Sequence, residues 1–445
     1  MFLQSNLNNK VKQEMNNLEQ KIALKYGNSK FNLNIEENKI KNIITANSAK
    51  KYKLEEIIKK ALAEPIASPR LKKIVKPGET VTIVISDITR SWQQIDKILP
   101  FLISELKEGG IKLKDINILA AVGSHRFHRE EEKKTLLGEY YGKINFFDHN
   151  GKDKSQLKYL GDTTYGTPVW INKLALDVDR LILTGGIIFH DLAGFAGGRT
   201  SILPGIAAYE SIMKNHSLAM SEFEGEGIKK TVTTNHLDNN PVNLDMLEAA
   251  EMVDVDFILN VIPDADSGIA AAVAGDLLKA HQKGCAICKE YFGIELEEKA
   301  DLVFASCGGY PKDINLYQAS KSLVNAAQAV KKEGYLILLA ECREGIGHSE
   351  VEEIIQNHTN NFERERALRS NFTISRYTGY LITKRIEDIN LILVTELDKE
   401  ILDNTDIRVV KTLAEAFKIV EAEFDQLPQS YIMPAAANTL PIFKD

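Results

Sequence analysis

The feature that most constrains the fold is a repeated order of strand, polar loop and helix. Val81–Ser86 is a run of β-branched residues, Asp87–Arg90 follows as a polar loop, and the stretch Gln93–Glu108 predicts a helix. The same order recurs after Ile116–Val122 and after Leu181–Thr184. Strands that alternate with helices in this way favour a parallel or mostly parallel sheet.

The length of the chain indicates more than one such unit. At 445 residues it exceeds a single ordinary core, so two large α/β domains or three small ones are expected. Turn chemistry at residues 263–268 marks a connection. Further strands are predicted at 302–306, 335–340 and 391–395. We predict an N-terminal α/β domain over residues 1–265, beginning with a helix and an edge hairpin, and a C-terminal α/β domain over residues 266–445, whose last residues pack back on the first.

Composition and charge exclude several classes of protein. With 44% hydrophobic and 26% charged residues, the chain has the balance of a globular protein. A net charge of −7 argues against a nucleic-acid scaffold, which needs a dominant basic surface. No apolar run approaches the length of a bilayer span, and the N-terminus lacks the pattern of a secretory signal. We therefore expect a cytoplasmic protein with neither a nucleic-acid nor a membrane partner.

The four cysteines are too few for a disulfide framework in so long a chain, which fits a reducing compartment. Cys285 and Cys288 form a Cys-x-x-Cys pair, with His281 one helical turn upstream. A zinc site would need a second ligand pair, and a redox site would need a thioredoxin-like context. The helical pattern over Asp276–Phe292 favours two partly buried structural thiols instead.

Polar side chains follow each of the three predicted strands of the first domain. These residues are Asp87, Arg90, His125, Arg126 and His190. In open α/β sheets the ligand crevice lies outside the carboxyl ends of the strands, so these residues are expected in one neighbourhood. A role as helix caps or turn residues would serve for Asp87 alone, but it fits two histidines and two arginines poorly. His128, three residues after His125, is expected to face solvent.

A glycine-rich loop at residues 185–205 follows the third strand. Gly194, Gly197 and Gly198 let the backbone approach a ligand closely, and the N-terminus of a following helix would offer unpaired N–H groups to an anion. The spacing matches neither a Walker loop nor a Rossmann fingerprint. From these residues alone, a phosphate cradle and a plain structural loop both stay open. His216 follows near a helix end, where the helix dipole would also favour a capping role.

The loop resembles the signature of the nickel-pincer lactate racemase family, down to the Asn-His-Ser of residues 215–217. Asp87–Arg90, Gly123–Arg126 and Gly308–Lys321 are similar to the family's other motifs, in the family's order and at comparable spacing. The resemblance runs from about Asp87 to the end of the second domain. It implies two α/β domains with the active site in the cleft between them.

The resemblance also implies a cofactor and a redox route to racemisation. The family's cofactor is a pyridinium mononucleotide that holds nickel through a carbon and two sulfurs, and one histidine completes the square-planar site. By position that histidine is His216. His125 and His190 match the family's acid–base pair, which takes and returns the hydroxyl proton while a hydride leaves and rejoins the α-carbon. The intermediate is then a planar 2-keto acid.

Substrate and cofactor contacts follow from the same resemblance. Arg90 would offer a bidentate fork to the substrate carboxylate, with Gln318 and Lys321 reaching in from the second domain. Asp87 would orient Arg90 or a histidine, and Tyr317 would line the substrate pocket. Surface salt bridges and core packing are the alternatives for these residues. The predicted cofactor-binding residues are Gly194, Gly197, Gly198, Arg199, Thr200 and Ser201.

The sequence departs from the family pattern at two places. Thr200 stands where the family loop carries the lysine that bonds covalently to the cofactor's thioamide arm. Because a hydroxyl cannot replace an amine in that bond, the cofactor is expected to bind non-covalently, held by His216 and the loop. Ser91 and Trp92 follow Arg90 in place of the family's proline, which would reshape one corner of the substrate pocket.

The leading hypothesis is a racemase or epimerase of a small, lactate-like 2-hydroxy acid, loaded through transient contact with cofactor-synthesis proteins. The alternative is a relative that binds nickel and the pincer nucleotide with little or no catalysis. An NAD-dependent hydroxy-acid dehydrogenase is a third possibility, which the missing dinucleotide fingerprint disfavours. Retention of His125, His190, Arg90 and Lys321 favours the enzyme, since a carrier needs neither an acid–base pair nor a carboxylate clamp.

Overall fold

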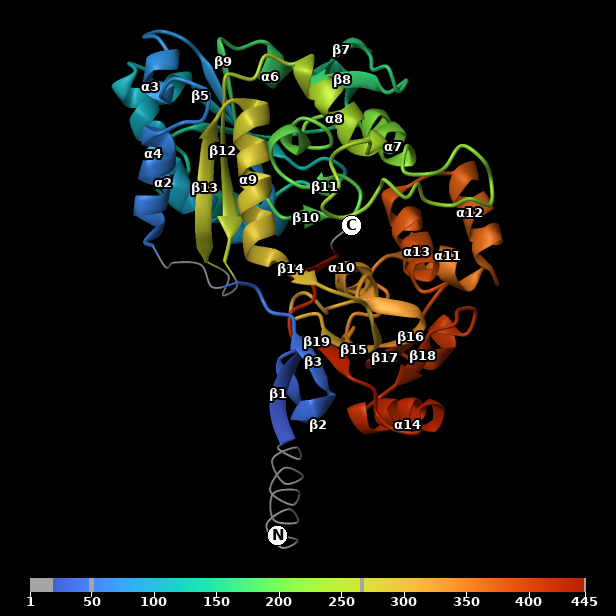
Figure 1. The fold of residues 1–445 in the computed structure, drawn as a ribbon. Helices are drawn as coiled ribbons and strands as arrows, with labels where there is room; N and C mark the ends of the chain where they lie inside the picture. Colours follow the sequence, from blue (N-terminus) through green and yellow to red (C-terminus); the bar gives the residue numbers. More distant parts are fainter. Residues whose placement is uncertain (1–18, 48–51, 265–267, 444–445) are drawn as a thin grey trace, which may run out of the picture. The chain divides into compact units, whose positions relative to one another are not determined.

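The computed structural model describes residues 19–47, 52–264 and 268–443. The chain forms two compact units (Figure 1). The first unit consists of residues 48–222 and 228–291. The second unit consists of residues 1–47, 223–227 and 292–445. Each is a mixed α/β structure built on one mostly parallel sheet, which confirms the predicted fold class.

A six-stranded sheet in the order β13-β12-β9-β4-β5-β6 forms the centre of the first unit. Its strands are β4 (Val81–Ser86), β5 (Ile116–Ala121), β6 (Asn145–Asp148), β9 (Arg180–Gly186), β12 (Phe257–Pro263) and β13 (Ile269–Gly275). All neighbours pair in parallel except β13, which runs antiparallel to β12 at the edge. The three strands predicted for this domain are β4, β5 and β9, so the strand predictions are confirmed.

The helices of the first unit connect these strands. They are α2 (Leu54–Ala63), α3 (Leu71–Ile74), α4 (Ile95–Glu108), α5 (Glu130–Leu137), α6 (Lys173–Leu176), α7 (Tyr209–Ser217), α8 (Pro241–Glu251) and α9 (Leu277–Phe292). The helices predicted after the first two strands are α4 and α5. Helix α9 runs alongside β12 and β13 in Figure 1. It packs so closely that a Cβ on Gly284 would lie 2.2 Å from the side chain of Ile187, just after β9, and 3.0 Å from that of Val273 in β13.

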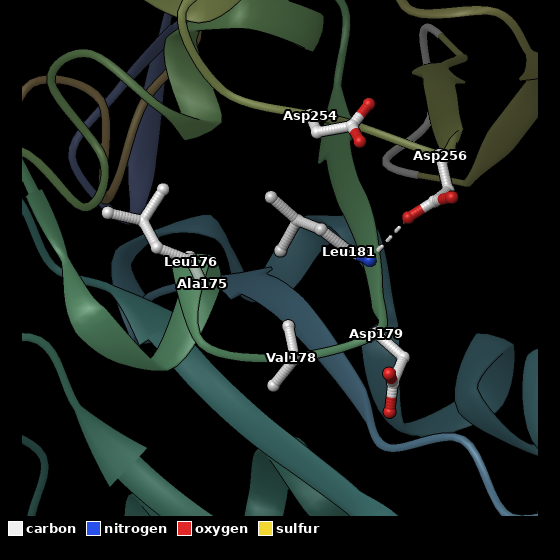
Figure 2. Close-up of a pocket in the computed structure, with 7 residues that line it drawn as sticks. All are labelled: Ala175, Leu176, Val178, Asp179, Leu181, Asp254 and Asp256. Atoms are coloured by element: carbon white, nitrogen blue, oxygen red, sulfur yellow. Dashed lines mark hydrogen bonds between the residues drawn. The ribbon is translucent and has the colours of Figure 1, made fainter.

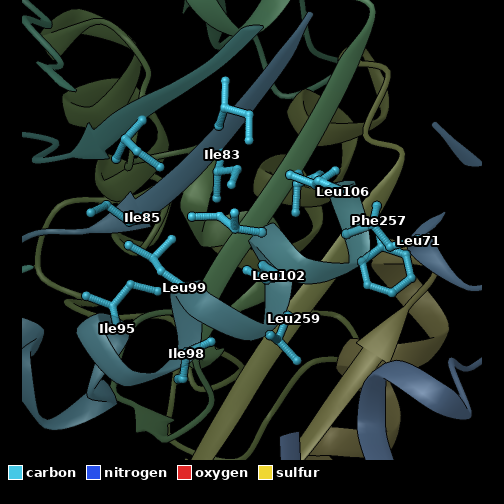
Figure 3. Close-up of a cluster of buried hydrophobic side chains, with 14 of the residues drawn as sticks. Leu71, Ile83, Ile85, Ile95, Ile98, Leu99, Leu102, Leu106, Phe257 and Leu259 are labelled. Carbon is cyan, nitrogen blue, oxygen red and sulfur yellow. The ribbon is translucent and has the colours of Figure 1, made fainter. Parts of the chain in front are cut away.

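The core of the first unit forms where one face of the sheet meets α2, α3 and α4 (Figure 3). In α4, Leu99, Leu102 and Leu106 recur at helical spacing and are fully buried. They pack against residues of the strands such as Ile83 and Phe257, which are also fully buried. Burying each of these side chains stabilises the unit by about 1.5–3 kcal/mol. This packing fixes the strands whose carboxyl ends carry the polar loops.

The second unit has its own six-stranded sheet, in the order β18-β17-β16-β15-β19-β3 and parallel throughout. Its strands are β3 (Ile40–Ile43), β15 (Ala300–Ser306), β16 (Val330–Leu339), β17 (Asn390–Val394), β18 (Arg408–Val410) and β19 (Ser430–Met433). Its helices are α10 (Leu316–Ala327), α11 (Ser349–Gln356), α12 (Asn361–Ser370), α13 (Ile374–Arg385) and α14 (Leu413–Glu423). None of the described helices of either unit has the length and apolar character that a membrane span requires.

The units divide the chain differently from the predicted boundary at residues 265 and 266. The first unit extends to residue 291, because β13 completes its sheet and α9 packs on that strand. The N-terminal segment belongs to the second unit, where β3 pairs with β19. The last strand, β20 (Leu440–Phe443), pairs with β14 (Gly293–Leu296) within the second unit.

The predicted edge hairpin near the N-terminus is present as β1 (Glu19–Tyr26) and β2 (Ser29–Glu36), which pair only with each other among the described strands. Gly27 supplies the turn with a φ of 52°, a value that favours glycine. The helix predicted ahead of this hairpin falls on residues outside the described part of the chain.

We expect Leu99→Ala to lower the free energy of unfolding of the first unit by about 2–5 kcal/mol, because it leaves a cavity in the core. The measurement is urea denaturation followed by circular dichroism. Leu278→Ala is the matched control, since that leucine is 38% exposed on α9 and should change the free energy by less than about 1 kcal/mol. Equal effects of the two substitutions would contradict the described core.

Candidate active site

In the sheet of the first unit, the direction in which successive strands are added reverses between β4 and β9. The chain passes from β4 outward to β5 and β6, and then returns to place β9 on the other side of β4. Such a switch point, at the carboxyl ends of parallel strands, is where open α/β sheets bind ligands. The loops that follow β4, β5 and β9 carry Asp87, His125 and His190, as the sequence predicted for their neighbourhood.

Asp87 and His125 form a carboxylate–imidazole pair across the ends of β4 and β5. Asp87 Oδ2 lies 2.7 Å from His125 Nδ1, while Thr89 donates its backbone N–H to Asp87 Oδ1 at 2.7 Å. Burial alone would raise the pKa of Asp87, but hydrogen bonds and charge from His125, the Thr89 hydroxyl and the Arg90 charge bring it down to about 2. A carboxylate at Nδ1 fixes the proton on that nitrogen, which leaves the Nε2 lone pair of the half-exposed His125 available as a base.

The two arginines near this pair differ in their contacts. Arg126 makes a two-pronged ion pair with Glu132, at 2.8 and 2.6 Å, so its guanidinium is already engaged. Arg90 donates to the neighbouring Thr89 hydroxyl at 3.1 Å. Within the described residues no carboxylate lies within ion-pair distance of Arg90, which leaves its planar fork suited to an anionic ligand.

His128 does not face solvent, so the prediction for this residue was wrong. Its side chain is buried, Nε2 accepts the Ile88 backbone N–H at 2.9 Å, and Nδ1 lies 2.5 Å from Asp148 Oδ1. The imidazole therefore ties the loop after β4 to the end of β6. Only tertiary packing distinguishes it from His125, and the local sequence carries no signal of that packing.

His190 lies on a short hairpin of β10 (Phe189–His190) and β11 (Gly194–Phe195). Its Nδ1 accepts the backbone N–H groups of Leu192 and Ala193 at 3.2 and 3.3 Å. Asp191 Oδ1 lies 3.5 Å from the same nitrogen. The ring therefore caps its own turn, with a carboxylate beside the capping bonds.

Two N–H groups of the glycine loop already have partners within the protein, which favours the structural-loop alternative for this part of the loop. Thr200 Oγ1 accepts the Gly197 N–H at 2.9 Å, and Asn260 Oδ1 accepts the Gly198 N–H at 2.7 Å. The segment that follows is a four-residue 3₁₀ turn, Gly198–Ser201, and not the start of an α-helix. The loop is thus closed by its own hydrogen bonds, and Asn260 of β12 is a contributor that sequence reasoning missed.

Arg199 and Ser201 also point into the protein. Arg199 is 3% exposed and donates to the carbonyls of Ala193 at 2.9 Å and Phe195 at 3.1 Å, with its Nη1 3.0 Å from His281 Nε2. Burial lowers the pKa of Arg199 to about 10. Ser201 Oγ donates to the Thr184 carbonyl at 3.1 Å. Direct cofactor contact by these two side chains stays a prediction, and their observed contacts are structural.

The Cys-x-x-Cys pair on α9 lies beneath the same loop. Cys285 and Cys288 are free thiols, 5% and 1% exposed, which agrees with the predicted structural role. Cys285 Sγ lies 3.5 Å from His281 Nε2. Burial raises the pKa of the Cys285 thiol to about 12, so this thiol stays protonated at neutral pH.

His216 is a buried, neutral imidazole in the last turn of α7. Burial, followed by the charge of His190, lowers its pKa to about 4, with the Ile212 carbonyl and Asp191 acting in the opposite direction. Its Nδ1 makes no hydrogen bond of acceptable geometry although the atom is buried. The preceding Asn215 fixes this turn, because its Nδ2 donates to Asp245 Oδ2 at 2.7 Å. A neutral imidazole with an unpartnered nitrogen has the properties of a metal ligand.

No group of three or more His, Cys, Asp or Glu that could hold a metal ion occurs among the described residues. A metal bound at His216 would therefore need its remaining ligands from another molecule. The pincer nucleotide implied by the resemblance supplies such ligands, so the donor set in this unit fits that kind of group at the metal end.

Trp92 shows what replaces the family's proline at this corner. Its ring packs on Gly186 at the end of β9, so closely that a Cβ on that glycine would lie 2.3 Å from the ring. The loop after β5 is tied in as well, because the Gly123 N–H donates to the Gly205 carbonyl at 3.0 Å. The loops that follow β4, β5 and β9 are therefore in contact with one another.

The remaining predicted site residues lie on α10 of the second unit. Asn315 caps this helix by accepting the Gln318 N–H at 2.9 Å. Lys321 Nζ lies 3.2 Å from Gln318 Oε1, and the Tyr317 ring lies 6.4 Å from that of His348. The spacing of Gln318 and Lys321 by one helical turn is confirmed, while the substrate-binding role of all three residues stays a prediction.

A small pocket lies at the amino ends of the strands of the first unit, away from the switch point (Figure 2). Its polar lining is Asp179, Asp254 and Asp256, near the amino ends of β9 and β12. Asp256 accepts the Leu181 N–H at 2.8 Å, and Asp179 accepts the Thr80 N–H at 2.8 Å. Asp179 and Asp256 therefore bind backbone N–H groups near the starts of strands, which is a structural role.

Comparisons with known proteins agree with this arrangement. Residues 26–227 match the lactate racemase N-terminal domain, and residues 296–435 match the lactate racemase C-terminal domain. Lactate racemase of Thermoanaerobacterium thermosaccharolyticum is 32% identical over 94% of this chain and 98% of that protein. Lactate racemase of Lactiplantibacillus plantarum is 32% identical over 85% of this chain and 89% of that protein.

Solved structures lead to the same family. The lactate racemase apoprotein of Thermoanaerobacterium thermosaccharolyticum superposes with a TM-score of 0.87 at 30% identity, covering 96% of this chain and all of that one. A Thermotoga maritima protein, at 18% identity and a TM-score of 0.61 over 88% of this chain and 98% of that one, shares the fold. The chain therefore belongs to the lactate racemase family and is an isomerase of the racemase type.

Proposed function

We propose that this protein racemises a small, lactate-like 2-hydroxy acid in the cytoplasm, with a nickel-pincer nucleotide as cofactor. The observation that carries the proposal is the Asp87–His125 pair at the switch point. It is supported by the His190 hairpin, which follows β9, and by the buried, neutral His216, whose pKa is lowered in part by the charge of His190. A pure carrier would not need a carboxylate-backed base. Cofactor-synthesis proteins are the expected transient partners.

The acid–base step falls to the two histidines. With its Nδ1 proton held by Asp87, His125 presents Nε2 to the substrate hydroxyl and takes its proton. Arg90 would hold the substrate carboxylate through its planar fork, which fixes the α-carbon relative to the base. His190 would serve the opposite face, returning a proton to the carbonyl oxygen of the planar keto acid.

The cofactor would be held at its metal end by His216. When bound, it would supply an acceptor that takes a hydride from the α-carbon and returns it to the other face. Thr200 carries no amine, and its hydroxyl is engaged with Gly197, so attachment is proposed to be non-covalent. Tyr317, Gln318 and Lys321 are retained as proposed substrate contacts from the second unit.

We expect His125→Ala and His190→Ala each to lower the rate of racemisation by roughly 10²–10⁴-fold in both directions, because each direction needs one base and one acid. The measurement is polarimetry of each lactate enantiomer with enzyme co-expressed with a pincer-synthesis pathway. His358→Ala is the control, since this ring bonds the Ile354 carbonyl in the second unit. A normal rate in either site variant would end the two-histidine proposal.

We expect His216→Ala to abolish nickel retention after desalting while the fold stays intact. The physical reason is that no group of three or more His, Cys, Asp or Glu among the described residues could hold nickel in place of His216. Elemental analysis reports the nickel, and circular dichroism reports the fold. Full metal content in this variant, at the level of His358→Ala, would refute His216 as the ligand.

We expect intact mass under denaturing conditions to show the bare chain, even when native mass spectrometry shows bound cofactor. Thr200→Lys should create a covalent adduct during co-expression, because it places an amine where the thioamide arm is expected. Thr200→Val is the matched control, since it removes the bond to the Gly197 N–H without adding an amine. A denaturation-resistant adduct on the threonine protein would show that another residue makes the link.

The same experiments separate the enzyme from the carrier alternative. A protein that retains nickel and nucleotide through His216 but racemises neither lactate enantiomer would be a binding relative. The absence of an attachment lysine is the observation that keeps this alternative open.

A further inference from the structure

The Nδ1 atom of His190 has two kinds of neighbour that demand opposite proton positions. The backbone N–H groups of Leu192 and Ala193 donate to it, which requires an unprotonated Nδ1. Asp191 Oδ1 lies 3.5 Å away, within ion-pair distance but beyond an ordinary hydrogen bond, and it could accept only from a protonated Nδ1. The two arrangements are different tautomers of the same neutral ring.

These tautomers differ in what they can do at Nε2. With Nδ1 capped by backbone N–H groups, the neutral ring carries its proton on Nε2 and has no lone pair there for a substrate proton. With the proton on Nδ1, Nε2 presents a lone pair and can act as a base. His125 is fixed in the second state by Asp87, at 2.7 Å. His190 reaches the same state when an acceptor such as the neighbouring Asp191 carboxylate takes its Nδ1–H bond.

We propose that Asp191 is the positioning residue of His190, holding the Nδ1–H tautomer that acid–base work requires and displacing the capping bonds of the turn. The catalytic consequence of this inference rests on the proposed racemase function. Its physical basis is the set of contacts that His190 Nδ1 makes. Asp191 is partly exposed on the hairpin, and its charge acts to raise the pKa of His216. It therefore lies near both His190 and His216.

The proton balance of the step is simple. His190 Nε2 takes the hydroxyl proton of the substrate, and the ring becomes an imidazolium whose Nδ1–H stays directed at the Asp191 carboxylate. In the reverse direction the imidazolium returns the Nε2 proton to the carbonyl oxygen of the keto acid and becomes the neutral Nδ1–H ring again. In this scheme Asp191 only accepts the Nδ1–H bond and exchanges no proton with the substrate.

The test uses the full chain labelled with ¹⁵N-histidine, in the free state and with racemic lactate added. The ¹⁵N shifts of the ring nitrogens report which one carries the proton, and His190→Gln assigns the signals. We expect a populated Nδ1–H form of His190 in the unsubstituted protein and a shift to the Nε2–H form in Asp191→Asn. Asp191→Glu should restore part of the Nδ1–H form.

The kinetic readout uses cofactor-loaded enzyme. Asp191→Asn should lower kcat by roughly 10²-fold, the lower end of what a positioned acid–base group contributes, with KM little changed. Asp162→Asn is the control, because it removes the same charge from an exposed strand end, where Asp162 accepts the Tyr159 hydroxyl. This control should leave both the tautomer and kcat unchanged.

Two results would overturn the inference. One is a His190 that stays in the Nε2–H form with and without lactate. The other is an Asp191→Asn protein whose tautomer or kcat equals that of the unsubstituted protein. If the loaded protein racemises nothing, the proposed function fails, while the tautomer measurement still decides the role of Asp191.

Discussion

The buried guanidinium of Arg199 is the interaction on which the site loops depend. A fully buried cation is costly unless its hydrogen bonds are satisfied, and no carboxylate in the described chain pairs with this one. Its Nη2 donates to the carbonyls of Ala193 and Phe195, which flank Gly194, while its Nε is buried without a hydrogen-bond partner. Gly194 pairs with His190, so the charge that holds the hairpin also sets where His190 lies.

Two levels of rigidity follow from this arrangement. The parallel sheet packs tightly against α4 and its neighbours, and this packing fixes the positions of the ends of β4, β5 and β9. Side chains such as His128 and Asn260 then carry that rigidity into the loops, by accepting backbone N–H groups of Ile88 and Gly198. The reactive groups stand on loops, but each loop is held to the sheet by a buried polar contact.

Much of this could be predicted from the sequence, because hydrophobic periodicity and turn chemistry are local signals. The β-branched run of β4 and the polar residues after it located both the sheet and Asp87, and the switch-point rule placed His125 beside it. The rest depended on tertiary contacts. His128 and His125 have similar local surroundings in sequence, yet only one is buried against Asp148.

The glycine loop shows the same limit. Its composition is equally compatible with a cradle of open N–H groups and with a closed structural turn, and the choice is made by Thr200 and Asn260, the second of them 62 residues from its partner Gly198. The bounds of the two units depend on tertiary contacts as well. An antiparallel edge strand such as β13 looks like the start of a new unit until its partner β12 is known.

The pairing of β3 with β19 has a consequence for how the chain is made. These two strands are nearly four hundred residues apart in sequence, with Ile40 opposite Ser430, and the whole first unit lies between them. During synthesis the first unit can close on itself as soon as its own residues have emerged. Strand β3 cannot pair until β19 has been made, so the sheet of the second unit is completed only after most of the described chain has been synthesised.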